Sequence, residues 1–294
     1  MYRSFQEILD RAQKSGRKKI VIAGGDDPIS IKAAERAYEL GMVTPIFVGE
    51  RQKIEKLTTR FEIIEAKSPD EACLKAVEIV RNEQDAILMK GHVTTREFLK
   101  AVLDSEKGLR AGKLLSHVAV VESPYYHKLL FVTDGGMVIK PTLEQKKFII
   151  QNAVEFTKKL GIEKPKVAIL AAVEKVNPDM PETMDAEALV DAQKRGEIKD
   201  CVIEGPMALD LAVSKFACEM KSYKGEVAGD ADILLMPDIA AGNISAKAML
   251  YLGGAKFGGA VVGTTKPCVM LSRADTDEIK LNSIALGVVT CGIH

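Results

Sequence analysis

The stretch KIVIAGGDDPISIKAAERAYELGMVTPIFV, residues 19–48, carries the pattern that decides the fold. The β-branched run Lys19–Ala23 is typical of a buried strand, and a Gly-Gly-Asp-Asp-Pro turn ends it. A helical pattern then covers Ser30–Leu40, Gly41 is typical of the residue after a helix, and Ile46–Val48 predicts the next strand. Strands separated by helices indicate a parallel sheet with helices on both faces.

The same alternation continues to the end of the chain. Ser68 followed by Pro69 and Glu71 predicts a helix start, and Pro141–Gln145 predicts another. Further strands are expected at residues 61–64, 86–89, 117–121, 129–132, 167–170, 201–204, 233–236, 259–262 and 268–271. The third and fourth of these are close enough in the sequence to form a hairpin.

We therefore predict an α/β protein made of two αβα domains with largely parallel sheets. The first domain is expected over residues 1–138 and the second over 139–275, because a new strand–helix series follows the predicted hairpin. A last helix, 276–294, is expected to pack back onto the first domain.

Composition excludes several classes of function. Among 294 residues, 41 Lys and Arg balance 41 Asp and Glu, which argues against nucleic-acid and membrane partners. No apolar run is long enough to span a bilayer, and the first residues lack the apolar core of a signal peptide. Five cysteines without a CxxC pair indicate reduced thiols in a cytoplasmic protein, and four histidines without ligand spacing predict no metal.

Ligands of parallel sheets bind where strands lead into helices, so the candidate site residues are those in such loops. Gly24 and Gly25 would let backbone N–H groups approach an anion, or they form only a tight turn before a helix. Lys90 stands at a predicted strand end and Lys100 in the helix after it. These basic residues are suited to phosphate, although solvated side chains on an outer helix face would have the same pattern.

The loop after the strand at 233–236 offers a second anion site. Gly242 leaves room for a ligand, Asn243 or Ser245 would stand near a helix N-cap, and Lys247 would lie in the first turn. The alternative is that Asn243 and Ser245 only cap the helix.

A third group follows the strand at 268–271. Arg273 is suited to binding an oxyanion, Ser272 offers a hydroxyl, and Asp277 or Glu278 could take a proton. The same residues also look like a helix start, with Asp275 as N-cap and Glu278 three residues later.

These last two groups resemble the signature of the phosphate acetyl/butyryl transferase family. The resemblance rests on Pro237-Asp238 with Ala241–Ile244 and Lys247, and on Ser272-Arg273. It extends over nearly the whole chain. Further matching stretches lie at residues 85–91, 108–120, 131–136, 173–178 and 204–210, and the segments 173–178 and 272–286 look like the butyryl branch.

Such a resemblance implies an enzyme that moves an acyl group between coenzyme A (CoA) and inorganic phosphate. The family's fold is similar to isocitrate and isopropylmalate dehydrogenases, with the active site in the cleft between two α/β domains. The resemblance further implies a homodimer or higher homo-oligomer, CoA as a substrate, no tightly bound cofactor and no metal.

The resemblance also assigns roles to residues. Ser272 would stabilise the transition state and Arg273 would bind the phosphate end. Glu278 would be the base that deprotonates the thiol of CoA, with its neighbour Asp277 as the alternative. The remaining expected contacts are Gly242, Asn243, Ser245 and Lys247 for phosphate, and Gly24, Gly25, Lys90 and Lys100 for CoA.

Other functions remain open at this point. A phosphate acetyltransferase would share the same residues. A non-catalytic domain that binds acyl-CoA or acyl phosphate is less compatible with the presence of both Ser272 and Arg273. A dehydrogenase of the same shape would need a dinucleotide fingerprint, which the sequence lacks.

Overall fold

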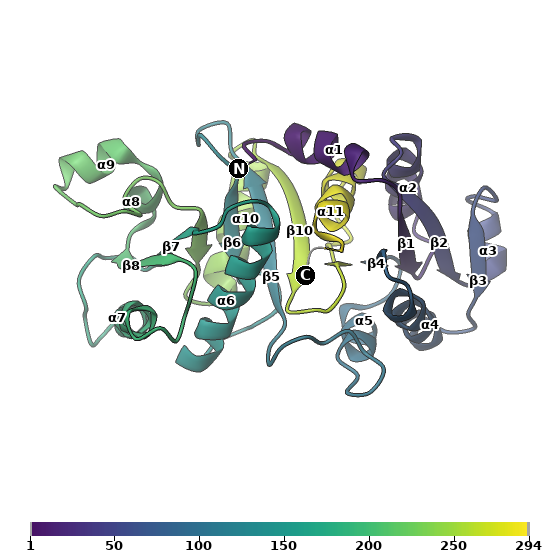
Figure 1. Cartoon of the computed structure of the whole chain (residues 1–294), viewed down its shortest axis with the longest axis horizontal. Coiled ribbons are helices and arrows are strands. Elements are labelled where there is room, and N and C mark those ends of the chain that lie inside the picture. The colour runs from purple at the N-terminus through teal and green to yellow at the C-terminus, as the bar shows by residue number, and fades with distance from the viewer. Residues whose placement is uncertain (1, 293–294) are drawn as a thin grey trace. The chain divides into compact units, whose positions relative to one another are not determined.

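A computed structural model describes residues 2–292 and confirms the α/β class (Figure 1). The chain forms two compact units. The N-terminal unit contains Phe5–Lys113 and residues 258–292, and the central unit contains Leu114–Phe257 together with residues 2–4.

Strands of the N-terminal unit follow the order β3-β2-β1-β4-β11-β10. Their bounds are β1 (Lys18–Ala23), β2 (Val43–Gly49), β3 (Glu62–Glu65), β4 (Ala86–Lys90), β10 (Lys256–Val262) and β11 (Cys268–Val269). Neighbouring strands pair in parallel except β10 and β11, which are antiparallel. The carboxyl ends of β1, β4 and β11 therefore lie side by side at one edge of the sheet.

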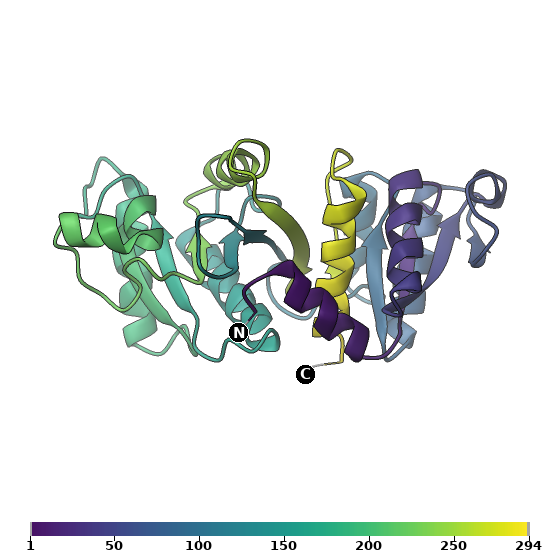
Figure 2. The ribbon, with the colours of Figure 1, turned by 90° about the horizontal axis from the view of Figure 1, so that it is seen from above.

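Helices cover both faces of this sheet, with α1, α2 and α11 on one face and α4 and α5 on the other (Figures 1 and 2). The bounds are α1 (Phe5–Lys14), α2 (Pro28–Glu39), α3 (Arg51–Glu55), α4 (Pro69–Asn82), α5 (Thr95–Val102) and α11 (Asp277–Thr290). Helix α11 packs between α1 and α2, and every residue from Ile279 to Thr290 is buried.

Local capping signals predicted some helix starts and missed others. The Ser68 hydroxyl accepts a hydrogen bond from the Glu71 N–H at 3.2 Å and caps α4, as predicted. The prediction of Asp275 as the cap of α11 is wrong, because Thr276 is the N-cap. The short helix α3 was not predicted.

Strands of the central unit follow the order β5-β6-β9-β7-β8. They are β5 (Ser116–Glu122), β6 (Leu130–Thr133), β7 (Lys166–Leu170), β8 (Val202–Met207) and β9 (Ile233–Leu235). The antiparallel β5–β6 hairpin confirms the prediction, and the other pairs are parallel. The helices are α6 (Leu143–Lys159), α7 (Pro181–Lys194), α8 (Leu209–Val213), α9 (Lys215–Met220) and α10 (Ile239–Tyr251).

The compact units divide the chain at other positions than the expected domains, 1–138 and 139–275. The reason is strand pairing: β6 pairs with β9, so the hairpin belongs to the sheet of the central unit. Strand β11 pairs with β4, which brings the chain back to the N-terminal unit before α11 begins. Positions 293 and 294 of the expected last helix lie outside the described residues.

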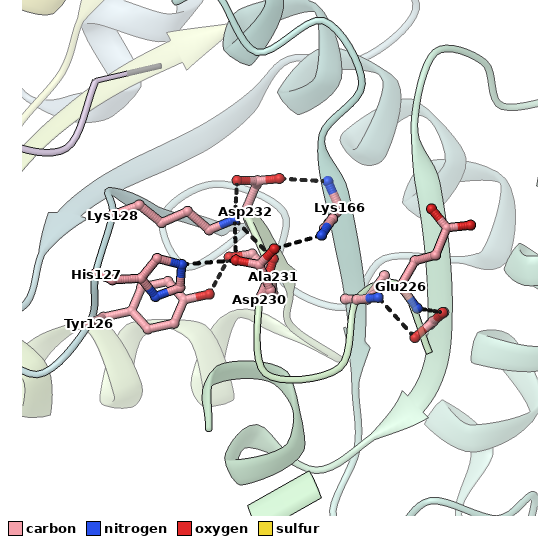
Figure 3. A network of polar contacts seen from close by, with 10 residues as sticks. Tyr126, His127, Lys128, Lys166, Glu226, Asp230, Ala231 and Asp232 are labelled. Carbon is pink, nitrogen blue, oxygen red and sulfur yellow. Dashed lines mark hydrogen bonds and ion pairs between the residues drawn. The ribbon is translucent and has the colours of Figure 1, made fainter. Parts of the chain in front are cut away.

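A network of charged side chains stands just before strands β6, β7 and β9 of the central unit (Figure 3). The buried Lys128 ammonium lies 2.7 Å from Asp232 Oδ1 and 3.0 Å from Asp230 Oδ1. Asp230 has two further contacts: Lys166 Nζ lies 2.6 Å from its Oδ2, and His127 Nε2 lies 2.9 Å from its Oδ1. Burial would raise the pKa of Asp230, but hydrogen bonds from Lys166 and Lys128 hold it well below its usual value.

We predict that Lys128→Met lowers the free energy of unfolding by about 3–5 kcal/mol, because it leaves the buried Asp232 carboxylate without its cation. The exposed Lys256, which lies 3.0 Å from Glu122, is the matched control. Lys256→Met should cost less than about 1 kcal/mol. Urea unfolding of both variants measures the difference, and equal losses would contradict the structural role of the network.

Candidate active site

A cavity of about 230 Å³ lies where β1, β4 and β11 end in the N-terminal unit. Its position agrees with the general rule that ligands bind at the carboxyl ends of parallel strands. The lining residues are Asp26, Asp27, Pro28, Lys90, Gly91, His92, Leu271, Ser272, Arg273 and Lys280. Three of these side chains are cations and two are carboxylates, so the cavity has a positive balance.

Two glycines let the ends of β1 and β4 approach closely. The Gly91 N–H donates to the Ala23 carbonyl at 2.9 Å, and the His92 N–H donates to the Gly24 carbonyl at 2.7 Å. A Cβ atom on Gly91 would overlap the Gly24 carbonyl oxygen, and Gly24 has a φ of +75°. The loop that carries His92 is therefore fixed against the end of β1.

The sequence predicted that the N–H groups of Gly24 and Gly25 are free to bind an anion, and the structure contradicts this. Both N–H groups donate to the Val48 carbonyl, at 2.9 and 3.0 Å. A Cβ atom on Gly25 would meet Phe47 at 2.7 Å. The glycines serve close packing, and the CoA contacts expected of them have no support from their N–H groups.

Lys280 is a site residue that the sequence reasoning missed. Its ammonium is buried and lies 2.7 Å from Asp27 Oδ2 and 2.9 Å from the Ser30 hydroxyl. Burial would raise the pKa of Asp27, but the bonds from Lys280 and Ser30 hold it below its usual value. Lys280 is the only charged residue in the stretch Ile279–Thr290, and that isolation is a signal that the sequence does contain.

Lys90, at the end of β4, lines the same cavity and is also buried. Its pKa is lowered, first by burial and then by the positive charges of Lys280 and Arg273. The structure thus brings together Lys90, Ser272 and Arg273, three of the residues expected to bind or react with substrate.

A tight turn after β11 orients the Ser272-Arg273 pair. The Ser272 N–H donates to Asp275 Oδ2 at 2.8 Å, and the Asp275 N–H donates to the Ser272 carbonyl at 3.2 Å. Asp275 therefore closes this turn and does not cap α11. Arg273 itself is exposed, so its guanidinium is accessible to a ligand.

A second cavity, of about 310 Å³, adjoins the first and reaches the start of α4 and of α5. Three residues line both cavities: Asp26, His92 and Arg273. His92 Nδ1 lies 3.2 Å from Asp26 Oδ2. Gly24 also lines the second cavity, together with the helix N-caps Ser68 and Thr94.

Other expected site residues of this unit line neither cavity. Asp277 forms an ion pair with Lys32 at 3.0 Å, and the hydrogen bond from Lys32 lowers its pKa. Glu278 is exposed at the second position of α11, where the third was expected. Lys100 is exposed and lies 3.1 Å from Asp70.

The remaining expected phosphate ligands lie in the central unit, on α10. The prediction that Asn243 or Ser245 begins this helix is wrong: Asp238 is the N-cap, accepting from the Ala241 N–H at 2.9 Å. The Asn243 amide donates to the Gly135 carbonyl at 3.1 Å. A Cβ atom on Gly242 would meet Asp134 and Gly135 at 2.7 Å, so this glycine serves helix–loop packing. Ser245 and Lys247 lie within the helix, and their assignment to phosphate stays a prediction.

The cysteines do not offer a nucleophile. All five are buried, and none forms a disulfide within residues 2–292. Burial raises the pKa of Cys73 to about 12 and that of Cys201 to about 11, which disfavours the reactive thiolate. Residues 2–292 contain no cluster of side chains suited to hold a metal ion and no helix long and apolar enough to cross a membrane.

Residues 59–288 match the family described as phosphate acetyl/butaryl transferase. The chain belongs to this family. A phosphate butyryltransferase from Clostridium acetobutylicum is 42% identical over 99% of both chains. A phosphate acetyltransferase from Thermotoga maritima is 40% identical, with 97% of this chain and 98% of the relative covered.

A solved structure supports the same membership. The branched-chain phosphotransacylase of Enterococcus faecalis V583 superposes with a TM-score of 0.85 at 34% identity, covering 94% of this chain and 100% of that one. This member of the phosphate acetyl/butaryl transferase family is therefore a phosphate acyltransferase. The named relatives differ in the acyl chain that they transfer, and their identities to this chain are close to one another.

We predict that Gly91→Ala lowers the free energy of unfolding by about 1–3 kcal/mol, because the new methyl group forces the ends of β1 and β4 apart. Gly112 is the control, since a Cβ atom there has no neighbour within 4 Å and its φ is not positive. Gly112→Ala should change stability by no more than about 1 kcal/mol. Thermal and urea unfolding measure both variants, and an unaffected Gly91→Ala would refute the close approach of the two strands.

Proposed function

We propose that the chain transfers a four-carbon acyl group, butyryl, between CoA and inorganic phosphate by direct attack of the thiolate in a ternary complex. The observation that carries the proposal is the cavity lined by Lys90, Ser272, Arg273 and Lys280. Its positive balance and small size suit a phosphate group.

The reaction needs groups of this kind. In the direction of acyl-CoA synthesis, the thiolate sulfur of CoA bonds to the carbonyl carbon of the acyl phosphate. The carbonyl oxygen becomes an oxyanion, the C–O bond to phosphate breaks, and the electron pair leaves with the phosphate. Arg273 and the Ser272 hydroxyl would stabilise the charge that develops on these oxygens. No enzyme nucleophile takes part, which agrees with the burial of the cysteines.

Coenzyme A is much larger than the first cavity, so we place part of it in the second. The two cavities meet at Arg273, which would bring the thiol end of CoA next to the bound phosphate. The thiol of CoA must also lose its proton. A free thiol like that of cysteine has a pKa of about 8.5 and is mostly protonated at neutral pH, so a base is needed. Glu278 stays the predicted base and Asp277 the alternative, although the ion pair with Lys32 makes Asp277 a weaker proton acceptor.

The butyryl assignment rests on the residues that look like the butyryl branch and on the relative from Clostridium acetobutylicum. Acetyl transfer is the second candidate, favoured by the relative from Thermotoga maritima. A homo-oligomer and a cytoplasmic location stay predictions. Ile244 and Tyr251 on α10 and the C-cap residue Leu252 are exposed, and they give the chain an apolar surface that a second copy would cover.

The first test is thiol release from acetyl-, butyryl- and isobutyryl-CoA, with and without inorganic phosphate. We expect release only with phosphate and a higher kcat/KM for the four-carbon substrates. A preference for acetyl-CoA would replace the butyryl assignment by phosphate acetyltransferase. No phosphate-dependent release from any of the three would overturn the proposed function.

We predict that Arg273→Ala lowers kcat by at least about 100-fold, because it removes a donor to the developing oxyanion. Arg195 is the matched control: it is exposed in the central unit and pairs with Glu197 at 2.7 Å. Arg195→Ala should keep the rate within about twofold of the unsubstituted protein. A rate for Arg273→Ala in that same range would exclude Arg273 from the site.

A further inference from the structure

Lys90 differs from the other buried lysines of the described chain. Lys128, Lys146 and Lys280 each hold their ammonium 2.7 Å from an aspartate oxygen. Lys90 is just as buried, at 6% exposure, but it forms no ion pair with any residue between 2 and 292. Its one hydrogen bond there reaches the Gly91 carbonyl at 3.4 Å, which is long for such a bond.

A buried ammonium without a partner is unfavourable, because it has lost its water and gained no compensating charge. The surroundings increase this cost. Lys280 and Arg273 add positive charge near Lys90, and the Asp27 carboxylate is already bound by Lys280 and Ser30. What the site lacks is an anion, and Lys90 lines the cavity into which an anion would fit.

The volume of the cavity indicates which anion binds there. At about 230 Å³ it is smaller than the ~300–1,000 Å³ of pockets that hold drug-sized ligands. A phosphate group would fit there, whereas the phosphates of CoA carry a nucleoside and a long arm. Ser272 and Arg273, the residues expected to act on the transferred phosphate, line this same cavity.

We propose that the Lys90 ammonium binds an oxygen of the phosphate that is transferred, together with Arg273. This deepens the proposed function and rests on it, and it moves Lys90 from the CoA contacts expected from the sequence to the phosphate. As the C–O bond of the tetrahedral intermediate breaks, the electron pair goes to the phosphate oxygen, and Lys90 stabilises that charge without giving up its proton.

Lys280 is the positioning residue for this contact. Its bond to Asp27 occupies a carboxylate whose charge acts on Lys90, and so keeps that carboxylate from pairing with Lys90. The Lys90 ammonium is thereby left available to the substrate.

The test compares Lys90→Met with the unsubstituted protein. In the assay of thiol release from butyryl-CoA, we expect kcat/KM for phosphate to fall about 100-fold or more, as for loss of one oxyanion donor. The KM for butyryl-CoA should change less than threefold. Lys90→Arg keeps the charge and should recover part of the loss. Lys146→Met removes a buried lysine of the central unit and should leave both KM values unchanged.

A readout independent of turnover is the rise in melting temperature on adding inorganic phosphate. We expect this rise for the unsubstituted protein and for Lys146→Met, and its loss for Lys90→Met. An unchanged rise for Lys90→Met would overturn the inference. So would a larger KM for butyryl-CoA with an unchanged KM for phosphate, since Lys90 would then bind CoA. If the unsubstituted protein shows no turnover at all, the proposed function fails, while the melting measurement still decides whether Lys90 binds phosphate.

Discussion

The contact between Lys280 and Asp27 is the interaction on which the rest of the site depends. It joins the start of α11 to the start of α2, across 253 positions of the sequence. Asp27 follows β1, and Lys280 follows the turn that carries Ser272 and Arg273. Lys280 is buried and Asp27 is half-buried, and their contact helps to hold these two strand exits together beside Lys90 at the end of β4. The contact acts together with the pairing of β1, β4 and β11, which brings the charged groups of the cavity to one edge of the sheet.

The electrostatics of the N-terminal unit follow from this contact. The half-buried Asp27 carboxylate already binds Lys280 and Ser30, and it forms no ion pair with Lys90. The result is a cavity with three cations and two carboxylates, in which one ammonium has no anionic partner among the described residues. Protein interiors normally pair their buried charges, and the cluster around Lys128 in the central unit does so (Figure 3). The central unit thus contains a structural ion network. The N-terminal unit contains a site for which we propose that the substrate supplies the counter-ion.

Much of the secondary structure could be predicted from local patterns. Alternating apolar runs and helix starts located nearly all strands, because burial of a strand and capping of a helix depend on residues close in sequence. The rule that predicts a helix N-cap from the local sequence failed where two adjacent residues could both cap the helix. Thr276 and Asp275 are adjacent, and Asp275 is taken by the Ser272 turn, so Thr276 caps α11. Gly242, which was expected to leave room for a ligand, lies within α10 and packs against Asp134 and Gly135.

The sequence by itself determined the α/β class, the order of the elements and the family, since each of these depends on local periodicity or on short motifs. It also contained Ser272, Arg273 and Lys90 as recognisable groups at strand ends. Only the tertiary structure decided that these groups share one cavity, that Lys280 joins them, and that Asp277 and Glu278 line neither cavity. The physical reason is strand order: β11 pairs with β4 and β4 with β1, and these pairings join segments far apart in the sequence that no local pattern specifies.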